Sequence, residues 1–340
     1  MKKLYIPYIL YQTSMSYGTY PYNLAEVSYV KDLVLFGLFI IIFLTGMFVL
    51  RIGLFNLSGE KLKTVLGKIT NRPWKGFLAG ILSTGILQSS SAVMVMTVGL
   101  VSSGSIAFRQ TIGIILGTNI GSTFTTEFMT FSLDSYIIPG VISGALFWLL
   151  PSTLARSLGT ALIGISSIFA AMSGFKFLSS SLANYPFTKH LLAEMDSHLF
   201  IALLTGIIMT AIIHSSSATI GITMSFLAGG DMALASAIAI MLGSNVGTCI
   251  TGWMASIGSG KDASLTAYAH IWLNLLGVLL FIPLIHYLGT FAQALTSSKD
   301  MQLAHASVLF NVFTSLAVLP FSKQFASFVL KIHTKKTHKF

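Results

Sequence analysis

The chain has 340 residues, of which 54% are hydrophobic and only 9% are charged, against roughly 25% charged residues in soluble domains. This balance excludes an ordinary soluble enzyme. Twenty Lys and Arg against ten Asp and Glu give a formal charge of +10, which fits basic cytoplasmic loops of a membrane protein as well as it fits nucleic-acid binding. Because long apolar runs accompany this charge, we expect a membrane protein with no nucleic-acid partner. The single cysteine, Cys249, excludes a disulfide framework.

In chain order, residues 1–30 are expected to form a tail, because they lack the cleavage pattern of a signal peptide. Apolar segments near the ~20 residues that cross a bilayer lie at 32–54, 107–131, 157–178, 232–257, 264–288 and 302–322, with a shorter one at 136–150. Two further apolar segments, 76–103 and 202–230, are interrupted by the polar tetrads Gln88–Ser91 and His214–Ser217. The sequence therefore predicts an all-α, multi-pass membrane protein in which two helices are broken.

An internal repeat is the strongest pattern in the chain. Residues 76–125 match residues 202–251 without a gap, with more than a third of the positions identical. The matches cluster at the serines of the tetrads and in two later stretches, GTNIGSTFTT at 117–126 and GSNVGTCITG at 243–252. The repeat predicts a first unit at 31–156 and a second at 157–290, followed by an extra C-terminal helix at 291–322 and a basic tail at 323–340.

The distribution of Lys and Arg predicts orientation but not topology. The basic loop after the first span and the basic C-terminal tail are both expected in the cytoplasm, which places the N-terminus outside. The interrupted segments can be re-entrant hairpins, which give inverted repeats, or crossing helices, which give parallel repeats. Both choices put the same number of basic residues inside, so the alternatives stay open at this point.

The broken segments are candidates for a binding site. A break inside the membrane exposes backbone N–H and C=O groups, which are tolerated only where they line a cavity. Serines at the N-terminus of a half-helix offer donors to an anion beside the positive end of the helix dipole, and the same oxygens can coordinate sodium. The alternative is that serine and alanine merely ease helix packing. Two breaks at matching positions favour the central site of a transporter.

The stretches that follow the breaks carry a G-x-x-x-G spacing, which predicts helix packing, together with polar groups that packing alone does not require. These polar candidates for the lining of a sodium or substrate site are Thr118, Asn119, Thr123 and Thr125 in the first copy and Ser244, Asn245, Thr248 and Thr251 in the second. Glu127 is the one acid expected within a span, where it is an ion or proton site or a solvated end group. His214 replaces Gln88 of the first copy; it makes transport pH-sensitive or is a neutral packed residue.

Other function classes fit less well. An intramembrane serine enzyme would need a separately positioned base, but His214 directly precedes Ser215, and Gln88 in the other copy cannot take a proton. We therefore expect no enzyme and no cofactor, with sodium as a coupling ion only. A channel is a further alternative.

The two motifs resemble those of the type II sodium-phosphate cotransporter family, in particular its bacterial members. That family has a duplicated unit with a QSSS motif in each re-entrant hairpin, followed by G-[AST]-N-[IV]-G-[ST] at the start of the next helix. Here the motifs are Gln88–Ser91 with Gly117–Ser122, and His214–Ser217 with Gly243–Thr248. The resemblance covers residues 31–290.

The resemblance implies inverted repeats, re-entrant hairpins and sodium-driven import of inorganic phosphate across the cytoplasmic membrane by alternating access. It implies that Ser89, Ser90, Ser91, Ser215, Ser216 and Ser217 hold phosphate, and that Gln88, Thr118, Asn119, Ser244 and Asn245 line the sodium and substrate sites. His214 departs from the second QSSS motif and leaves one sodium ligand open. The regulatory domain that many bacterial relatives append is expected to be absent. Another small oxyanion or a carboxylate is the alternative substrate, and a homodimer is left open.

Overall fold

The computed structural model describes residues 24–69 and 72–334. Within these residues every regular element is helical. The α-helices are α1 (Leu24–Ile69), α2 (Pro73–Leu87), α3 (Ser90–Ser102), α4 (Phe108–Phe128), α5 (Ile137–Leu149), α6 (Thr153–Ala183), α7 (Pro186–Ser197), α8 (Leu199–Ile213), α9 (Ser216–Gly229), α10 (Leu234–Ser256), α11 (Lys261–Phe281), α12 (Ile285–Leu295), α13 (Lys299–Val318) and α14 (Ser322–His333). The 3-10 helices are η2 (Asp134–Tyr136), η3 (Ile282–Leu284) and η4 (Leu319–Phe321).

The prediction of a multi-pass, all-helical membrane protein is confirmed. Among the described residues, five helical runs are long and apolar enough to cross a bilayer, and α7 with α8, bent by 120°, would make a sixth. These runs are Ser28–Ser58, Thr153–Ala183, Leu234–Ser256, Lys261–Leu295 and Lys299–His333. The predicted span at 107–131 is the buried helix α4, whose polar motif keeps it out of this set.

Glycines bring α2 into backbone contact with α4, and α8 into backbone contact with α10. A Cβ atom added to Gly113 would lie 2.1 Å from the carbonyl oxygen of Pro73, and one added to Gly117 would lie 2.1 Å from that of Phe77. A Cβ atom on Gly243, the equivalent of Gly117, would lie equally close to a carbonyl oxygen of α8. The G-x-x-x-G spacing therefore serves helix packing, as one interpretation of the sequence predicted.

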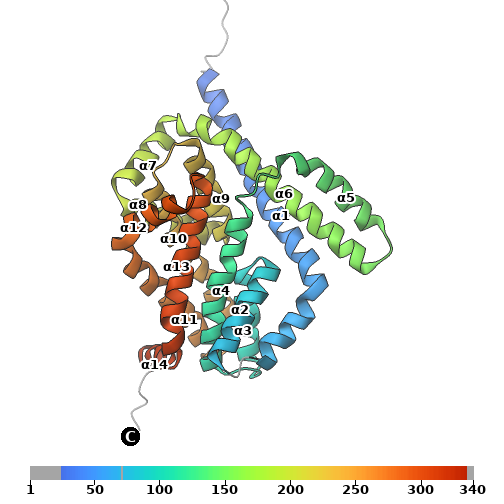
Figure 1. Cartoon of the computed structure of the whole chain (residues 1–340), viewed down its shortest axis with the longest axis vertical. Helices are drawn as coiled ribbons and strands as arrows, with labels where there is room; N and C mark the ends of the chain where they lie inside the picture. Colours follow the sequence, from blue (N-terminus) through green and yellow to red (C-terminus); the bar gives the residue numbers. More distant parts are fainter. Residues whose placement is uncertain (1–23, 70–71, 335–340) are drawn as a thin grey trace, which may run out of the picture.

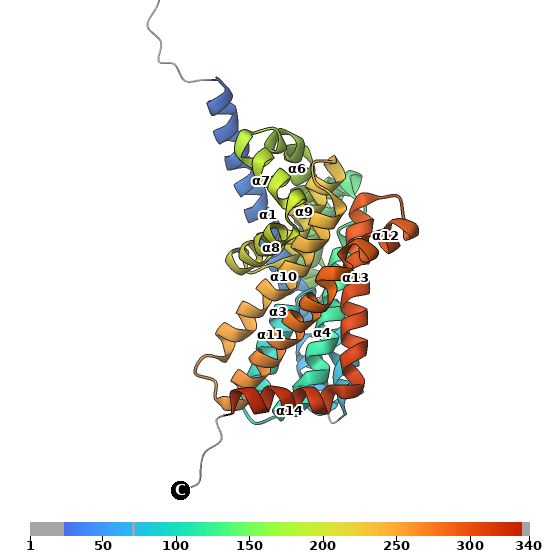
Figure 2. The ribbon, with the colours of Figure 1, turned by 90° about the vertical axis from the view of Figure 1, so that its left-hand side faces the viewer.

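The same contacts show that each pair of helices runs parallel. Residue numbers rise together along α2 and α4, from Pro73 beside Gly113 to Thr84 beside Gly121. Because parallel neighbours begin at the same end, α3 returns the chain to the end where α2 started, and α9 does the same for α8. The first broken pair lies in the lower part of the molecule beside α14, and the second lies in the upper part beside α7 (Figures 1 and 2).

The remaining helices surround these two units. The long helix α1 packs along α6 through small residues, since Cβ atoms on Gly53 and Gly164 would lie 2.6 Å and 2.4 Å from backbone nitrogens of the partner helix. Helix α5 packs on α6 at the side of the molecule (Figure 1). A large buried apolar cluster joins α1, α6, α8, α9, α10 and α13, and a smaller one joins α4, α11 and α14.

The two ends of the chain differ in detail from the sequence-based segments. Helix α1 begins at Leu24, inside the segment 1–30 that was expected to be a tail, and residues 1–23 lie outside the described residues. The segment 291–322 contains the end of α12, all of α13, and η4. Residues 323–333 of the expected basic tail belong to helix α14, because apolar residues at helical spacing give them a face to bury.

Candidate substrate and ion site

The two tetrads break their helices in the same way. Gln88 and His214, with φ of 50° and 55°, are the two residues other than glycine that adopt a positive φ in the described part of the chain. Each ends a helix in the left-handed conformation, and the following Ser89 or Ser215 is extended and begins the next helix. A strained backbone persists only where its surroundings over-determine it. The repeat seen in sequence is thus also a repeat of backbone conformation.

The first serine of each trio caps the helix that follows. The Oγ atom of Ser89 accepts a hydrogen bond from the backbone N–H of Ala92 at 3.1 Å, and that of Ser215 accepts from Ala218 at 3.2 Å. Both serines are buried. Their hydroxyl oxygens are therefore committed to shaping the breaks.

The second and third serines present free donors. The first N–H groups of a helix have no intrahelical acceptor, and at α3 and α9 these groups belong to Ser90, Ser91, Ser216 and Ser217. All four side chains are half-buried. Hydroxyls, free N–H groups and the positive end of a helix dipole together form the kind of site that holds a small anion.

Each serine helix packs on the polar-motif helix of the other copy. Thr251 of α10 donates a hydrogen bond to the Oγ atom of Ser91 at 3.2 Å. In the other pairing, the Sδ atom of Met129, just beyond α4, lies 3.5 Å from the position of a Cβ atom on Gly221 of α9. Thr125, near the end of α4, is buried. The structure thus places the third serine of the first tetrad beside the late threonine of the second copy.

The two motif asparagines have different partners. Buried Asn119 donates to the Oδ1 atom of Asn274 on α11 at 3.1 Å, and Asn274 in turn donates to the carbonyl oxygen of His270 at 3.0 Å. Half-buried Asn245 instead donates to the carbonyl oxygen of Met241 on its own helix at 2.9 Å. Sequence reasoning missed Asn274, although a polar residue inside the apolar segment 264–288 was a usable signal.

The motif hydroxyls bond locally. Thr118, Thr123, Ser244 and Thr248 donate to carbonyl oxygens three or four residues earlier on their own helices, at 2.7–2.8 Å. Their protons are engaged, so these groups can still serve as oxygen acceptors but not as free donors.

Gln88 and His214 occupy different environments despite their shared backbone conformation. The Nε2 atom of Gln88 donates to the carbonyl oxygen of Gly85 at 2.5 Å, and no donor among the described residues reaches its buried Oε1 atom. The buried hydroxyls of Ser83 and Thr84 on the same helix end are likewise without a partner in the described chain. His214 is exposed. The sequence predicted that Gln88 and His214 both line one site. In the structure, Gln88 has a buried side-chain oxygen, whereas the side chain of His214 is exposed.

The second copy lacks such free oxygens for a clear reason. Thr210, the equivalent of Thr84, donates to Thr219 at 2.9 Å. In the first copy Val93 stands in the place of Thr219, and in the second copy Met209 stands in the place of Ser83. Buried polar atoms without partners are costly. The first copy consequently keeps three buried oxygens without a partner among the described residues, on the last turns of α2 and on the residue that ends it.

Glu127 is paired with a residue from outside the repeats. Its Oε1 atom lies 2.8 Å from the Nδ1 atom of His305 on α13, and both side chains are about a quarter to a third exposed. The pair joins the C-terminal end of α4 to α13.

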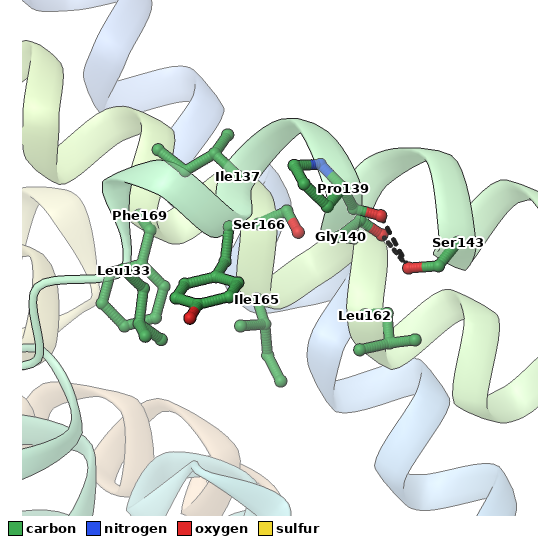
Figure 3. Close-up of a pocket in the computed structure, with 10 residues that line it drawn as sticks. Leu133, Ile137, Pro139, Gly140, Ser143, Leu162, Ile165, Ser166 and Phe169 are labelled. Carbon is green, nitrogen blue, oxygen red and sulfur yellow. Dashed lines mark hydrogen bonds between the residues drawn. The ribbon is translucent and has the colours of Figure 1, made fainter.

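A cavity of 520 Å³ lies elsewhere, where η2 and α5 meet α6 (Figure 3). Its lining is mostly apolar, and the hydroxyl of Ser143, one of the polar groups there, donates to the carbonyl oxygen of Pro139 at 2.7 Å. None of the predicted site residues lines it. This cavity is therefore separate from the candidate site.

Comparisons with known proteins point to one family. A sequence model of the Na+/Pi-cotransporter family matches residues 42–180 and again residues 174–318. YqeW of Bacillus subtilis is 44% identical over 86% of this chain and 95% of its own length. YjbB of Salmonella typhimurium, whose name assigns it provisionally to inorganic phosphate export, is 24% identical over 84% of this chain and 53% of its own length. The human sodium-dependent phosphate transport protein 2B is 26% identical over 42% of this chain and 21% of its own length.

The chain thus spans about half the length of YjbB and a fifth of the human protein. No solved structure matches it. The family model matches the chain twice, and each match contains one of the two helix breaks. Together the two matches cover most of the chain. The chain belongs to the Na+/Pi-cotransporter family.

Proposed function

We propose that the chain is a sodium-coupled secondary transporter that imports inorganic phosphate across the cytoplasmic membrane by alternating access. The observation that carries this proposal is the duplicated helix break, in which Ser89 and Ser215 cap two half-helices in the same way. Free donors at the starts of α3 and α9 suit an oxyanion. The name of the human relative, a sodium-dependent phosphate transport protein, supports phosphate as the substrate and sodium as the coupling ion.

In this proposal the broken pairs are re-entrant hairpins of two inverted repeats. The parallel packing of α2 with α4 and of α8 with α10 supports the hairpins, because α3 and α9 then return to the side of entry. The positions of the two units at opposite ends of the molecule support the inversion (Figures 1 and 2). Discontinuous helices at equivalent places in inverted repeats are typical of secondary transporters.

Charge supports a cytoplasmic C-terminus. Exposed or half-buried basic residues gather where α2, α4, α11 and α14 meet, and most of the described acids lie toward the opposite end. The basic residues are Arg72, Lys75, Arg109, Lys261, Lys323 and Lys331. Since basic residues favour the cytoplasmic side, this end faces inward, and the start of α1 at the opposite end faces outward (Figure 2).

Phosphate would lie between the N-termini of α3 and α9, held by the N–H groups and hydroxyls of Ser90, Ser91, Ser216 and Ser217. Sodium would lie beside the first break, on the buried oxygens of Gln88, Thr84 and Ser83 that have no partner in the described chain. The cation then neutralises part of the anion's charge in a region of low dielectric constant, which makes phosphate binding depend on sodium.

The test is uptake of radiolabelled phosphate into proteoliposomes under an inward sodium gradient, with potassium as the matched cation. Ser90→Ala and Ser216→Ala are expected to abolish sodium-dependent accumulation, while Ser180→Ala, at an exposed position on α6, keeps it. Uptake that is equal in sodium and potassium would contradict the coupling. Sodium-dependent accumulation of labelled sulfate or a small carboxylate, without accumulation of phosphate, would assign another substrate.

Export is the second candidate, and the similarity to YjbB favours it. Vesicles preloaded with phosphate separate the two directions. Faster release than entry at matched sodium gradients, in protein of known orientation, would support export over import.

A further inference from the structure

Helix α14 turns away from the span α13 that precedes it and lies across one end of the molecule (Figure 2). The 3-10 helix η4, which contains Pro320, forms the bend between them. A short helix that follows a membrane span and turns across its end lies at the depth of the lipid headgroups. The faces of α14 therefore decide what it contacts there.

One face of α14 is fixed to the protein. Ala326 and Val329 are fully buried against α4 and α11. Near the end of the helix, the ring of His333 stacks on Tyr268 with ring centres 3.9 Å apart, and its Nε2 atom accepts a hydrogen bond from Trp272 at 2.9 Å. The orientation of α14 about its own axis is consequently set by the protein.

A second face carries an apolar stripe that the described chain leaves largely uncovered. Phe321, Phe325, Phe328 and Ile332 recur at spacings of four, three and four residues, about 100° around the helix from the buried face. Phe321 is 61% exposed, Phe328 37% and Ile332 48%. Such a stripe beside a bilayer enters the boundary between headgroups and acyl chains.

A third face is basic and polar. Lys323, Ser327 and Lys331 are exposed on the side away from both the protein and the apolar stripe. Other basic residues gather at the same end, together with Asp262. The sequence continues with Lys335, Lys336 and Lys339. This charge complements anionic lipid headgroups.

We propose that α14 is an interfacial helix that binds the surface of an anionic phospholipid leaflet. Phe321, Phe328 and Ile332 enter the boundary with the acyl chains, and Lys323 and Lys331 contact headgroup phosphates. A zwitterionic lipid can bury the apolar stripe, but it does not attract the lysines. Because both interactions hold the helix at the membrane surface, we expect the stripe to be buried more deeply in anionic than in zwitterionic lipid. This inference rests on membrane insertion and is independent of the transported solute.

The experiment uses the full-length protein in vesicles, with a nitroxide label on Phe328→Cys or on Ser327→Cys. The native Cys249 is buried and serves as the unlabelled background. Collision rates with oxygen report lipid exposure, and those with a water-soluble nickel chelate report water exposure. In vesicles that contain phosphatidylglycerol, the label at 328 is expected to favour oxygen and the label at 327 to favour nickel.

In phosphatidylcholine alone, the preference of the label at 328 for oxygen should fall. The double substitution Lys323→Gln with Lys331→Gln should abolish the difference between the two lipids, whereas Lys189→Gln on α7 at the opposite end should preserve it. A water-exposed label at 328 in both lipids, or an immersion indifferent to lipid charge, overturns the proposal. Spin–spin broadening that grows with the protein-to-lipid ratio also overturns it, because it assigns the stripe to a second copy of the chain.

Discussion

Replacing Gly117 with alanine tests whether α2 and α4 rely on direct backbone contact. The added Cβ atom would lie 2.1 Å from the carbonyl oxygen of Phe77, whereas ordinary contact begins near 3.4 Å. The two helices must separate by about 1.3 Å locally, against atoms that cannot rotate away. Overpacking of this kind costs about 1–3 kcal/mol. Gly243→Ala is expected to cost the same, because its Cβ atom would lie equally close to the carbonyl oxygen of Leu203.

The assay is thermal unfolding in detergent, followed by intrinsic fluorescence, with sodium-driven phosphate uptake measured on the folded fraction. A loss of about 2 kcal/mol lowers the apparent melting temperature by roughly 3 °C, because the entropy of unfolding is about 2.1 cal/mol/K per residue over 340 residues. Gly99→Ala on α3 is the matched control, since a Cβ atom there meets nothing within 4 Å. If Gly117→Ala unfolds at the same temperature as the control, the inferred backbone contact is wrong.

Three further predictions concern the helix breaks and the pair on α13. Ser89→Ala and Ser215→Ala should each lower stability by about 1 kcal/mol through loss of a helix cap, and equal shifts in thermal unfolding would reflect the equivalent geometry. Gln88→Gly should raise the sodium concentration needed for half-maximal uptake, because it removes a buried oxygen, whereas His214→Gly should leave that concentration unchanged. Glu127→Leu should lower the unfolding temperature slightly, by no more than about 1 kcal/mol for a partly exposed pair, while Glu127→Gln retains a hydrogen-bond acceptor and most of that stability.

Each of these predictions has an outcome that contradicts it. A cap substitution without any effect in one copy would mean that the two breaks are not equivalent in energy. An identical sodium dependence in the two glycine variants would remove the buried glutamine from the ion site. A Glu127→Leu variant as stable as Glu127→Gln would show that the contact with His305 contributes nothing measurable.

The features that local sequence determines were predictable. A run of three serines after Gln88 and His214 interrupts an apolar segment, and the breaks occur at those residues. The spacing of Gly117 and Gly121 predicted a packing face, because a missing side chain is a local property. Helix existence followed from apolar length in the same way.

The partners of these residues were not predictable, because they depend on how distant segments meet. Asn119 is hydrogen-bonded to Asn274, and Glu127 contacts His305. In neither pair are the two residues equivalent positions of the repeat. The exposure of His214 follows from tertiary packing, since its backbone conformation is the same as that of Gln88. The helical part of the basic tail depends on the surface that α4 and α11 offer to Val329.

The backbone contact between α2 and α4 has a mechanical consequence. Side chains between two helices act as a compliant layer that lets them slide by small steps, as in shear motions. Here glycine removes that layer over about two turns, from Gly113 to Gly121. The helix before each break and the glycine-containing helix packed on it, α2 with α4 and α8 with α10, are therefore expected to move together as one rigid pair. A rearrangement that opens the centre of the molecule to one side must therefore bend the chain at the serines, or rotate each rigid pair against α1 and α6. It does not slide the two helices of a pair past each other.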